Sequence, residues 1–128
     1  MQTLELKLPS DGNAPAAARR QVADSGVVER KRLPDALLLI SELVTNAVKH
    51  GPSNDGSIDL KIYADPGRLR VEVEADGAGF TPPADWDLVV PQSGGMGLRL
   101  LRSMADRWGI DPSPSALRTV VWFEFESV

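Results

Sequence analysis

The sequence predicts an α+β protein, a two-layer α/β sandwich in which about three helices cover one face of a mixed, mainly antiparallel sheet. Apolar and polar residues alternate along residues 58–64 and again along residues 69–76, with Asp65-Pro66-Gly67 between them, which is typical of a hairpin. Segments with helical spacing precede and follow this hairpin. At 128 residues the chain is long enough for one hydrophobic core, so we expect a single domain over residues 1–128.

The amino-terminal part of the chain predicts one strand and two helices. Leucines alternate with polar residues over residues 4–8, which indicates a strand. A helix is expected over residues 14–24, where Asn13 can cap the first turn. A second helix is expected over residues 34–50, because a proline opens it and Gly51 directly follows its last residue.

The second helix is amphipathic, and its two faces differ in chemistry. The stripe that we expect to face the sheet consists of Leu37, Ser41, Val44 and Val48, flanked by Ile40 and Ala47. The opposite side carries Glu42, Asn46 and Lys49. Because Glu42 and Asn46 are four residues apart, they share a helix face, and both could reach one bound ion or phosphate.

The carboxyl-terminal part of the chain predicts a loop, a third helix and a last strand. The loop covers residues 81–93 and contains three prolines. The third helix is expected from about residue 95 to residue 108, with Gly109 as its stop. Alternating apolar residues predict the last strand over residues 119–125.

Two pairs of glycines lie on either side of the loop. Gly77 and Gly79 follow the second strand of the hairpin, and Gly95 and Gly97 open the third helix. A glycine pair lets the backbone approach a ligand where a Cβ atom would intrude. Together with the acid and the amide of the second helix, these glycines outline a nucleotide site.

Composition and charge exclude several classes of function. With 14 basic and 18 acidic residues the net charge is −4, so no overall positive field attracts nucleic acid. The absence of cysteine excludes disulfides, thiol catalysis and cysteine metal ligands. No signal peptide and no apolar run long enough to cross a bilayer are visible. We therefore expect a cytoplasmic protein that contacts neither a membrane nor nucleic acid directly.

Several segments resemble the GHKL ATP-binding superfamily, which includes histidine kinases, gyrase and Hsp90. Residues 41–51 (SELVTNAVKHG) resemble its N-box, residues 76–80 (DGAGF) its first glycine box and residues 94–98 (GGMGL) its second. Residues 100–109 and 119–124 resemble the closing parts of the same family. The segments cover nearly the whole chain in the family's order, and they are most similar to the small bacterial anti-sigma-factor serine kinases. The resemblance implies the Bergerat-type sandwich, with ATP and Mg²⁺ as ligands.

Carried over by position, the resemblance assigns roles to five side chains around a bound ATP. Asn46 would be the Mg²⁺ ligand, and Glu42 would be the base that activates a hydroxyl or water. Lys49 or His50 would neutralise phosphate charge, although the same two residues equally suit a helix C-terminus, where cations interact with the helix dipole. Thr119 would line the base pocket from the last strand.

The same resemblance assigns backbone contacts to the glycine boxes. Gly77 and Gly79 would let the chain turn against the nucleotide base. Residues 81–93 would form the ATP lid. At the start of the third helix, free backbone amides would donate hydrogen bonds to phosphate oxygens. These amides belong to Gly95, Met96, Gly97 and Leu98.

One position departs from the family pattern. The first glycine box of the family reads Asp-x-Gly-x-Gly, and its Asp accepts a hydrogen bond from the adenine amino group, but residue 75 here is Ala75. Strand parity directs Ala75 inward and Asp76 outward, so the neighbouring Asp cannot replace it unless a β-bulge at the strand end shifts the register. The family's usual glycine before Thr119 is also absent, since Arg118 stands there. Loss of a hydrogen bond to a charged group, about 1.5–3 kcal/mol, would weaken ATP binding roughly tenfold to a hundredfold.

Two functions follow from the resemblance and its departure. The first is an ATP-binding regulator like the anti-sigma kinases, a protein serine/threonine kinase that phosphorylates a small antagonist protein, sequesters a sigma factor, or does both. The alternative is a non-catalytic protein-binding module of the same fold, with nucleotide binding weakened or lost at Ala75. A homodimer is a further option for either function.

Overall fold

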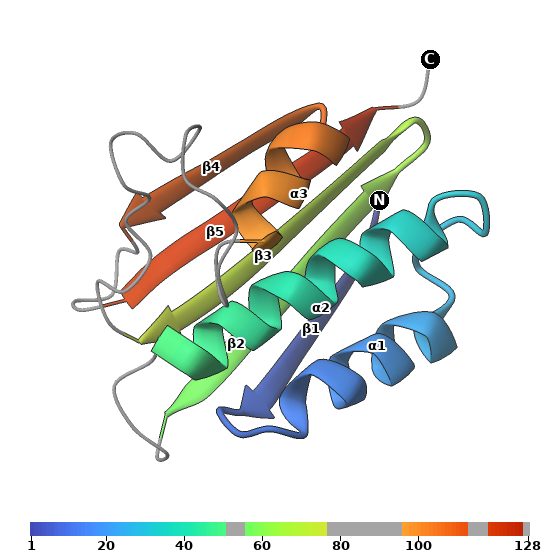
Figure 1. The fold of residues 1–128 in the computed structure, drawn as a ribbon. Coiled ribbons are helices and arrows are strands. Elements are labelled where there is room, and N and C mark those ends of the chain that lie inside the picture. The colour runs from blue at the N-terminus through green and yellow to red at the C-terminus, as the bar shows by residue number, and fades with distance from the viewer. Residues whose placement is uncertain (51–55, 77–95, 113–117, 127–128) are drawn as a thin grey trace.

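A computed structural model of the chain describes residues 1–50, 56–76, 96–112 and 118–126 (Figure 1). Five strands and three helices make up this part of the chain. In order they are β1 (Gln2–Pro9), α1 (Ala14–Ser25), α2 (Leu33–His50), β2 (Ser57–Asp65), β3 (Arg68–Asp76), α3 (Met96–Met104), β4 (Arg107–Pro112) and β5 (Arg118–Glu126). The α+β sandwich that the sequence predicts is confirmed.

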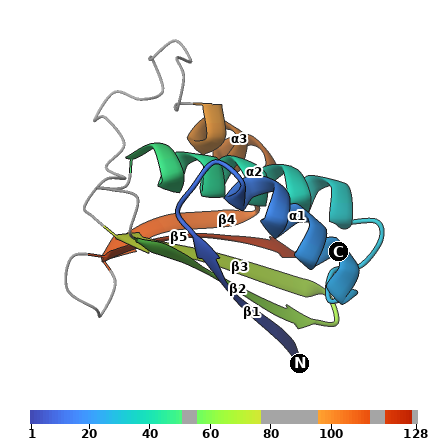
Figure 2. The same cartoon turned by 90° about the horizontal axis from the view of Figure 1, so that it is seen from below.

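The strands form one five-stranded sheet in the order β1-β2-β3-β5-β4. Each of the four strand pairs in the described part of the chain is antiparallel. The three helices lie together on one face of the sheet, and the other face is left open by the described elements (Figure 2). None of these helices combines the length and the hydropathy that crossing a membrane requires.

The hairpin of β2 and β3 follows the predicted alternation. Gly67 adopts a positive φ of 83° in the turn, a conformation that glycine reaches without steric cost. Leu69, Val71 and Val73 are buried beneath the helices. The charged residues between them lie on the open face, so the inward and outward series of β3 are those that the sequence predicts.

The predicted third helix is too long, and a strand was missed. α3 ends at Met104 rather than at residue 108, and residues 107–112 form β4 at an edge of the sheet. The amide of Asp106 donates to the carbonyl oxygen of Glu124, so the backbone pairs with β5 directly after the helix. Trp108 and Ile110 then pack against the core with strand spacing. The spacing of apolar residues in this short segment fits a helix and a strand alike.

Gly109 has a packing role rather than the predicted role of a helix stop. It lies in β4 opposite Trp122 of β5. A Cβ atom at position 109 would lie 2.7 Å from Nε1 of Trp122, closer than real Cβ contacts allow. The indole therefore occupies the space that the missing side chain leaves.

The buried face of α2 differs from the predicted stripe. The sheet lies beneath α2, and α1 and α3 contact its two sides (Figure 1), so burial covers a wide arc. Leu37, Ser41 and Val48 are only half-buried, and Nη1 of Arg19 in α1 donates to Oγ of Ser41 at 2.6 Å. The prediction is confirmed for Ile40, Val44 and Ala47, and the fully buried residues of α2 are Ala36, Leu39, Ile40, Leu43, Val44, Asn46 and Ala47.

The expected cap of α1 is also absent. Asn13 makes no side-chain hydrogen bond to the first turn of the helix. Its own backbone amide donates to Oδ1 of Asp11 at 2.8 Å, so the aspartate organises this turn in its place.

Candidate functional site

Asn46 is a polar residue inside the core. We expected it on the outer side of α2, but its side chain is only 2% exposed, between the buried Leu43 and Ala47. Its Nδ2 atom has no hydrogen-bond partner among the described residues, and it is the one buried side-chain nitrogen or oxygen there of which this is true. An unpaired buried amide costs about 1–3 kcal/mol, so it indicates a partner that is not part of the described chain.

The position of this amide within α2 matters for what it can bind. Asn46 lies in the carboxyl-terminal half of α2, which Figures 1 and 2 place at the same end of the molecule as the end of β3 and the start of β5. Rotation of the carboxamide exchanges its oxygen and its nitrogen, so either atom can face this end. The carbonyl oxygen can serve a cation, and the amide hydrogens can serve a phosphate oxygen.

Glu42 lies one helical turn before Asn46 and is partly exposed. The four-residue spacing puts a carboxylate near the surface and an amide below it on one side of α2. Lys49 follows on the last turn and is exposed. The side chain of His50 lies outside the described residues. The structure thus combines an accessible acid with a buried, unsatisfied amide.

The two positions assigned to the nucleotide base are neighbours in the sheet. Ala75, near the end of β3, pairs with Thr119 of β5 and with Ile58 of β2. Ala75 is half-buried and packs against the core, as its strand parity predicts. Directly opposed residues of antiparallel strands have Cβ atoms about 4.5–5.5 Å apart. Ala75 and Thr119 can therefore line one pocket wall, and that wall has no carboxylate at position 75.

Asp76 is held on the other face of the sheet. Its Oδ1 accepts a hydrogen bond from Nη1 of Arg118 at 2.5 Å. Arg118 also binds Oε2 of Glu74 at 2.8 Å and Oδ2 of Asp59 at 3.0 Å. The prediction that Asp76 cannot replace the missing Asp at position 75 is consistent with this arrangement, because the carboxylate points away and is already bound.

Arg118 is a neighbour of the candidate site whose network the sequence analysis missed. Burial by itself lowers the pKa of Arg118, but hydrogen bonds with Glu74 and Asp76 outweigh burial and raise the pKa. Its guanidinium also reaches the carbonyl oxygens of Ser57 and Glu74, at 3.5 Å and 3.2 Å. One arginine therefore joins the ends of β2, β3 and β5. The cross-strand register of three outward acids with an outward arginine was the signal that could have revealed it.

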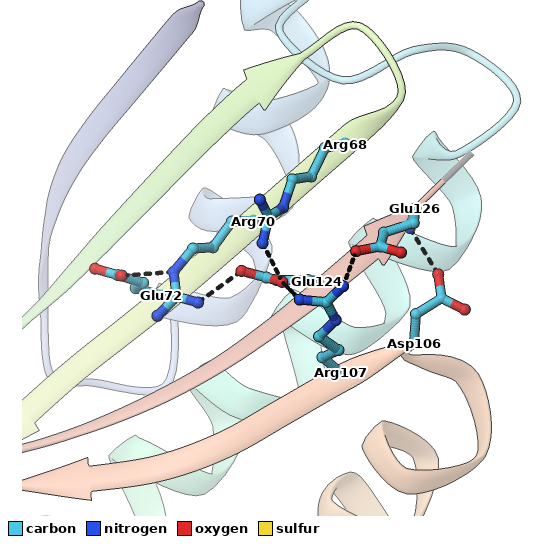
Figure 3. Close-up of polar contacts among 7 residues, drawn as sticks. All are labelled: Arg68, Arg70, Glu72, Asp106, Arg107, Glu124 and Glu126. Atoms are coloured by element: carbon cyan, nitrogen blue, oxygen red, sulfur yellow. Dashed lines mark hydrogen bonds and ion pairs between the residues drawn. The ribbon is translucent and has the colours of Figure 1, made fainter. Parts of the chain in front are cut away.

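A second ionic cluster lies on the open face and does not belong to the site (Figure 3). Glu124 of β5 is only 3% exposed and binds Arg70 at 2.7 Å and Arg68 at 2.9 Å. Arg107 lies 3.9 Å from Glu124 and pairs with Glu126 at 2.5 Å. The cluster stabilises the sheet on the side opposite to the helices, so it has no access to Asn46.

A cavity of about 330 Å³ opens at the other end of the molecule. It is lined by apolar side chains such as Val27 and Leu69, with Arg32 and Asp65 among its polar residues. Arg32 stacks over the ring of Phe125 at 5.2 Å and donates to the carbonyl oxygen of Glu126 at 2.6 Å. Arg32 precedes Asn46 by 14 residues, about 20 Å of helix, so this cavity is separate from the candidate site.

Several predicted site residues cannot be located. Gly77, Gly79 and Gly95 and the predicted loop over residues 81–93 lie outside the described residues. Met96, Gly97 and Leu98 form the first turn of α3, and only their backbone is described. The helix therefore begins at the second glycine box, where the first backbone amides have no partner within the helix.

The described residues limit what could hold a metal ion. Within the described ranges, no group of three or more histidine, cysteine, aspartate or glutamate side chains could bind one. Of the described residues, Asn46 would offer its side-chain oxygen to a divalent cation there, alongside ligand oxygens and water. Mg²⁺ suits this ligand set, because it keeps several waters and uses few protein ligands.

Comparison with known families gives one match over most of the chain. The sequence profile described as "Histidine kinase-like ATPase domain" matches residues 8–125. Among curated proteins, Blue-light-activated histidine kinase 2 of Erythrobacter litoralis (strain HTCC2594) is 36% identical over 77 residues. That match covers 58% of this chain and 21% of the histidine kinase, so this chain spans about a fifth of its relative.

Solved structures share the fold. The RsbU and RsbW domains of Rv1364c from Mycobacterium tuberculosis match 98% of this chain with a TM-score of 0.71 and 22% identity. The blue-light activated histidine kinase EL346 of Erythrobacter litoralis matches 88%, with a TM-score of 0.59 and 24% identity. The matched parts are 32% and 39% of those two chains. The histidine kinase domain of EL346 alone gives a TM-score of 0.57 at 25% identity, covering 92% of this chain and 61% of that domain.

Proposed function

The chain belongs to the histidine kinase-like ATPase domain family, and from that premise we propose that it binds ATP with Mg²⁺ and acts as a regulatory protein kinase of the anti-sigma type. The observation that carries this proposal is the buried carboxamide of Asn46, whose Nδ2 has no partner in the described chain. A leucine or alanine at this position would avoid the cost of burying an amide. The amide is explained if a ligand completes it.

The chemistry of the site divides among three groups. Asn46 would hold the cation through its side-chain oxygen. Bound Mg²⁺ would neutralise negative charge on the phosphate oxygens. Glu42, near the surface on the same side of α2, would accept the proton of the hydroxyl that attacks the terminal phosphate. Backbone amides at the start of α3, over residues 96–98, would donate to phosphate oxygens.

The regulatory role rests on similarity. The motifs are most similar to those of the anti-sigma serine kinases, and one similar structure contains a domain named RsbW. The partner would be a small antagonist protein that carries the target serine, a sigma factor, or each in turn. In a purified system, transfer of labelled phosphate from ATP to a serine of such an antagonist would support the kinase role.

A second function is favoured by the residues at the end of β3. Ala75 gives the base no acceptor, and Arg118 holds Asp76 on the opposite face at 2.5 Å. Both features would weaken adenine binding. The alternative is therefore a non-catalytic protein-binding module that uses the same sandwich and binds nucleotide weakly or not at all.

Calorimetric titration of ATP with and without Mg²⁺ separates the two functions. The kinase proposal expects Mg²⁺-dependent binding, and Asn46→Ala should weaken it about tenfold to a hundredfold, the effect of losing one contact with a charged group. Thr45→Ala, a partly exposed neighbour on α2, is the matched control and should bind like the wild type. Absence of ATP binding by the unaltered protein would leave only the protein-binding module.

A further inference from the structure

The strands that end beside the candidate site keep one register up to their last described pair. β3 pairs with β2 over residues 68–75 and with β5 over residues 68–76, and each step along β3 is one step along its partner. A β-bulge would set two residues of one strand against one residue of the other, and none of these described pairs does so. The register therefore keeps Ala75 on the side of the helices and Asp76 on the open face.

Three acids near this end of the sheet lie on the open face, and Arg118 binds all of them. Its side chain is only 15% exposed. Its Nη1 donates to Oδ1 of Asp76 at 2.5 Å. Its Nε donates to Oε2 of Glu74 at 2.8 Å, and its Nη2 donates to Oδ2 of Asp59 at 3.0 Å. To reach a nucleotide base on the other face, any of these carboxylates would have to leave the arginine and cross the sheet.

The helix side of the same strand ends is uncharged. Ala75 pairs there with Ile58 of β2 and with Thr119 of β5. Ala75 and Ile58 have no polar side-chain atom, and the hydroxyl of Thr119 is able both to donate and to accept a hydrogen bond. The described strand residues of this wall therefore include no side chain that favours an amino group over a carbonyl group.

Adenine and guanine differ at the ring position that the family's Asp at residue 75 recognises. Adenine has an amino group there, which donates, whereas guanine has a carbonyl oxygen, which accepts. A carboxylate would therefore attract adenine and repel guanine. Ala75 does neither. A water molecule in place of the carboxylate could donate or accept, so it could serve either base.

The groups assigned to the phosphates are present, in contrast. The buried Nδ2 of Asn46 has no partner among the described residues. α3 begins at Met96, and the first backbone amides of a helix have no partner within it. Mg²⁺ and the phosphate oxygens are the same in every nucleoside triphosphate. The contacts that this chain retains are thus contacts with the part of the ligand that does not vary.

We propose that the site accepts nucleoside triphosphates as a class, through Mg²⁺ and the phosphates, and that it does not select adenine. This inference rests on the proposed function and deepens it, because the phosphate donor would then be ATP or GTP. The observation that carries it is the unbroken register of β3, which leaves the uncharged Ala75 on the side of the helices and Asp76 bound to Arg118 on the other.

Titration of the unaltered protein with two nucleotides tests the inference directly. In the presence of Mg²⁺, the calorimetric affinities for ATP and GTP should agree within about threefold, which is less than the tenfold or more that one charged hydrogen bond supplies. Tripolyphosphate with Mg²⁺ has no base and should compete with both nucleotides. This comparison requires no variant, so it does not depend on whether an altered chain folds.

Two variants separate the base from the phosphates. Ala75→Asp should raise the ratio of ATP affinity to GTP affinity about tenfold or more. Asn46→Ala should weaken the binding of both nucleotides by the same factor and leave their ratio unchanged. Thr45→Ala is the control and should bind both like the unaltered protein. Circular dichroism verifies that each variant is folded.

The outcomes distinguish this inference from the proposed function. If the unaltered protein binds ATP tenfold or more tightly than GTP, or if tripolyphosphate does not compete, the inference is overturned and the proposed function stands. If the unaltered protein binds neither nucleotide, the proposed function fails and the inference fails with it. Similar affinities for ATP and GTP, with competition by tripolyphosphate, support both.

Discussion

At the scale of single residues, Asn46 is a polar side chain in an apolar part of the core, with its Nδ2 unpaired among the described residues. The side chain lies among leucine, valine and alanine residues that α2 presents to the sheet and to its neighbouring helices. An amide there gains nothing over an apolar side chain unless its polar atoms are satisfied. Burial of an unsatisfied group by the fold is therefore a stronger indication of a ligand than the position of the residue in a motif.

Ala75→Asp tests whether position 75 faces the nucleotide base. The carboxylate would lie on the same side of β3 as the inward Val73 and beside Thr119, so ATP affinity should rise about tenfold to a hundredfold. GTP affinity should not rise, since guanine has a carbonyl oxygen at the ring position where adenine has the amino group that the new acceptor binds. Isothermal titration with both nucleotides measures the difference.

The matched control for this variant is Asp76→Asn. Because Arg118 holds Asp76 on the opposite face, removing its charge should leave ATP affinity unchanged. If Asp76→Asn weakened binding and Ala75→Asp had no effect, the outward aspartate would be the one that recognises the base. The assignment of position 75 would then be wrong.

At the scale of elements, β4 depends on the fit of Gly109 against Trp122. Gly109→Ala would put a Cβ atom 2.7 Å from Nε1 and 2.8 Å from Cε2 of that indole. Overpacking of this kind costs about 1–3 kcal/mol, so the free energy of unfolding should fall by that amount. Urea denaturation measures it, with Gly12→Ala as control, because no heavy atom lies within 4 Å of a Cβ built there. Equal stability of the two variants would contradict the packing role.

The elements that the sequence predicted well have one unambiguous period. The β2–β3 hairpin alternates cleanly, and β3 has the predicted inward and outward residues. The segment after α3 is too short for its period to distinguish helix from strand, and only its pairing with β5 decides in favour of β4. The buried face of α2 was predicted only in part, because the sequence does not show that α1 and α3 cover its sides.

The candidate site was likewise predicted only in part from the sequence. The motif identified Asn46 and Glu42, and strand parity identified Ala75 as inward. The network of Arg118 was missed, because it joins residues from β2, β3 and β5 whose register is defined only in the assembled sheet. The outward acids and the outward arginine are visible in the sequence, but the strand order and register that bring them together are not.

At the scale of the whole molecule, the open face of the sheet makes stability depend on pH. Burial raises the pKa of Glu124, but hydrogen bonds from Arg68 and Arg70 outweigh it, so the pKa is lowered from its usual 4.5 (Figure 3). A lowered pKa contributes stability that is present above about pH 4.5 and is lost as the pH falls toward the value in the folded state.

Glu124→Gln should therefore be less stable than the unaltered protein at neutral pH and should lose less stability on acidification. Urea denaturation at a series of pH values, from neutral to below pH 4.5, measures the free energy of unfolding of both proteins. Asp24→Asn, an exposed carboxylate on α1, serves as control and should follow the unaltered protein. Parallel pH profiles for Glu124→Gln and the unaltered protein would show that the cluster has no such effect.

The central claim is that the buried amide of Asn46 meets a metal-bound nucleotide. The most direct measurement is nuclear magnetic resonance of the side-chain amides, of which the chain has three from asparagine. Mn²⁺, which can replace Mg²⁺ and broadens nearby signals, should abolish the Asn46 resonance when added with ATP, while that of Asn13 at the start of α1 persists. An Asn46 signal that neither shifts with Mg²⁺ and ATP nor broadens with Mn²⁺ and ATP would contradict the claim.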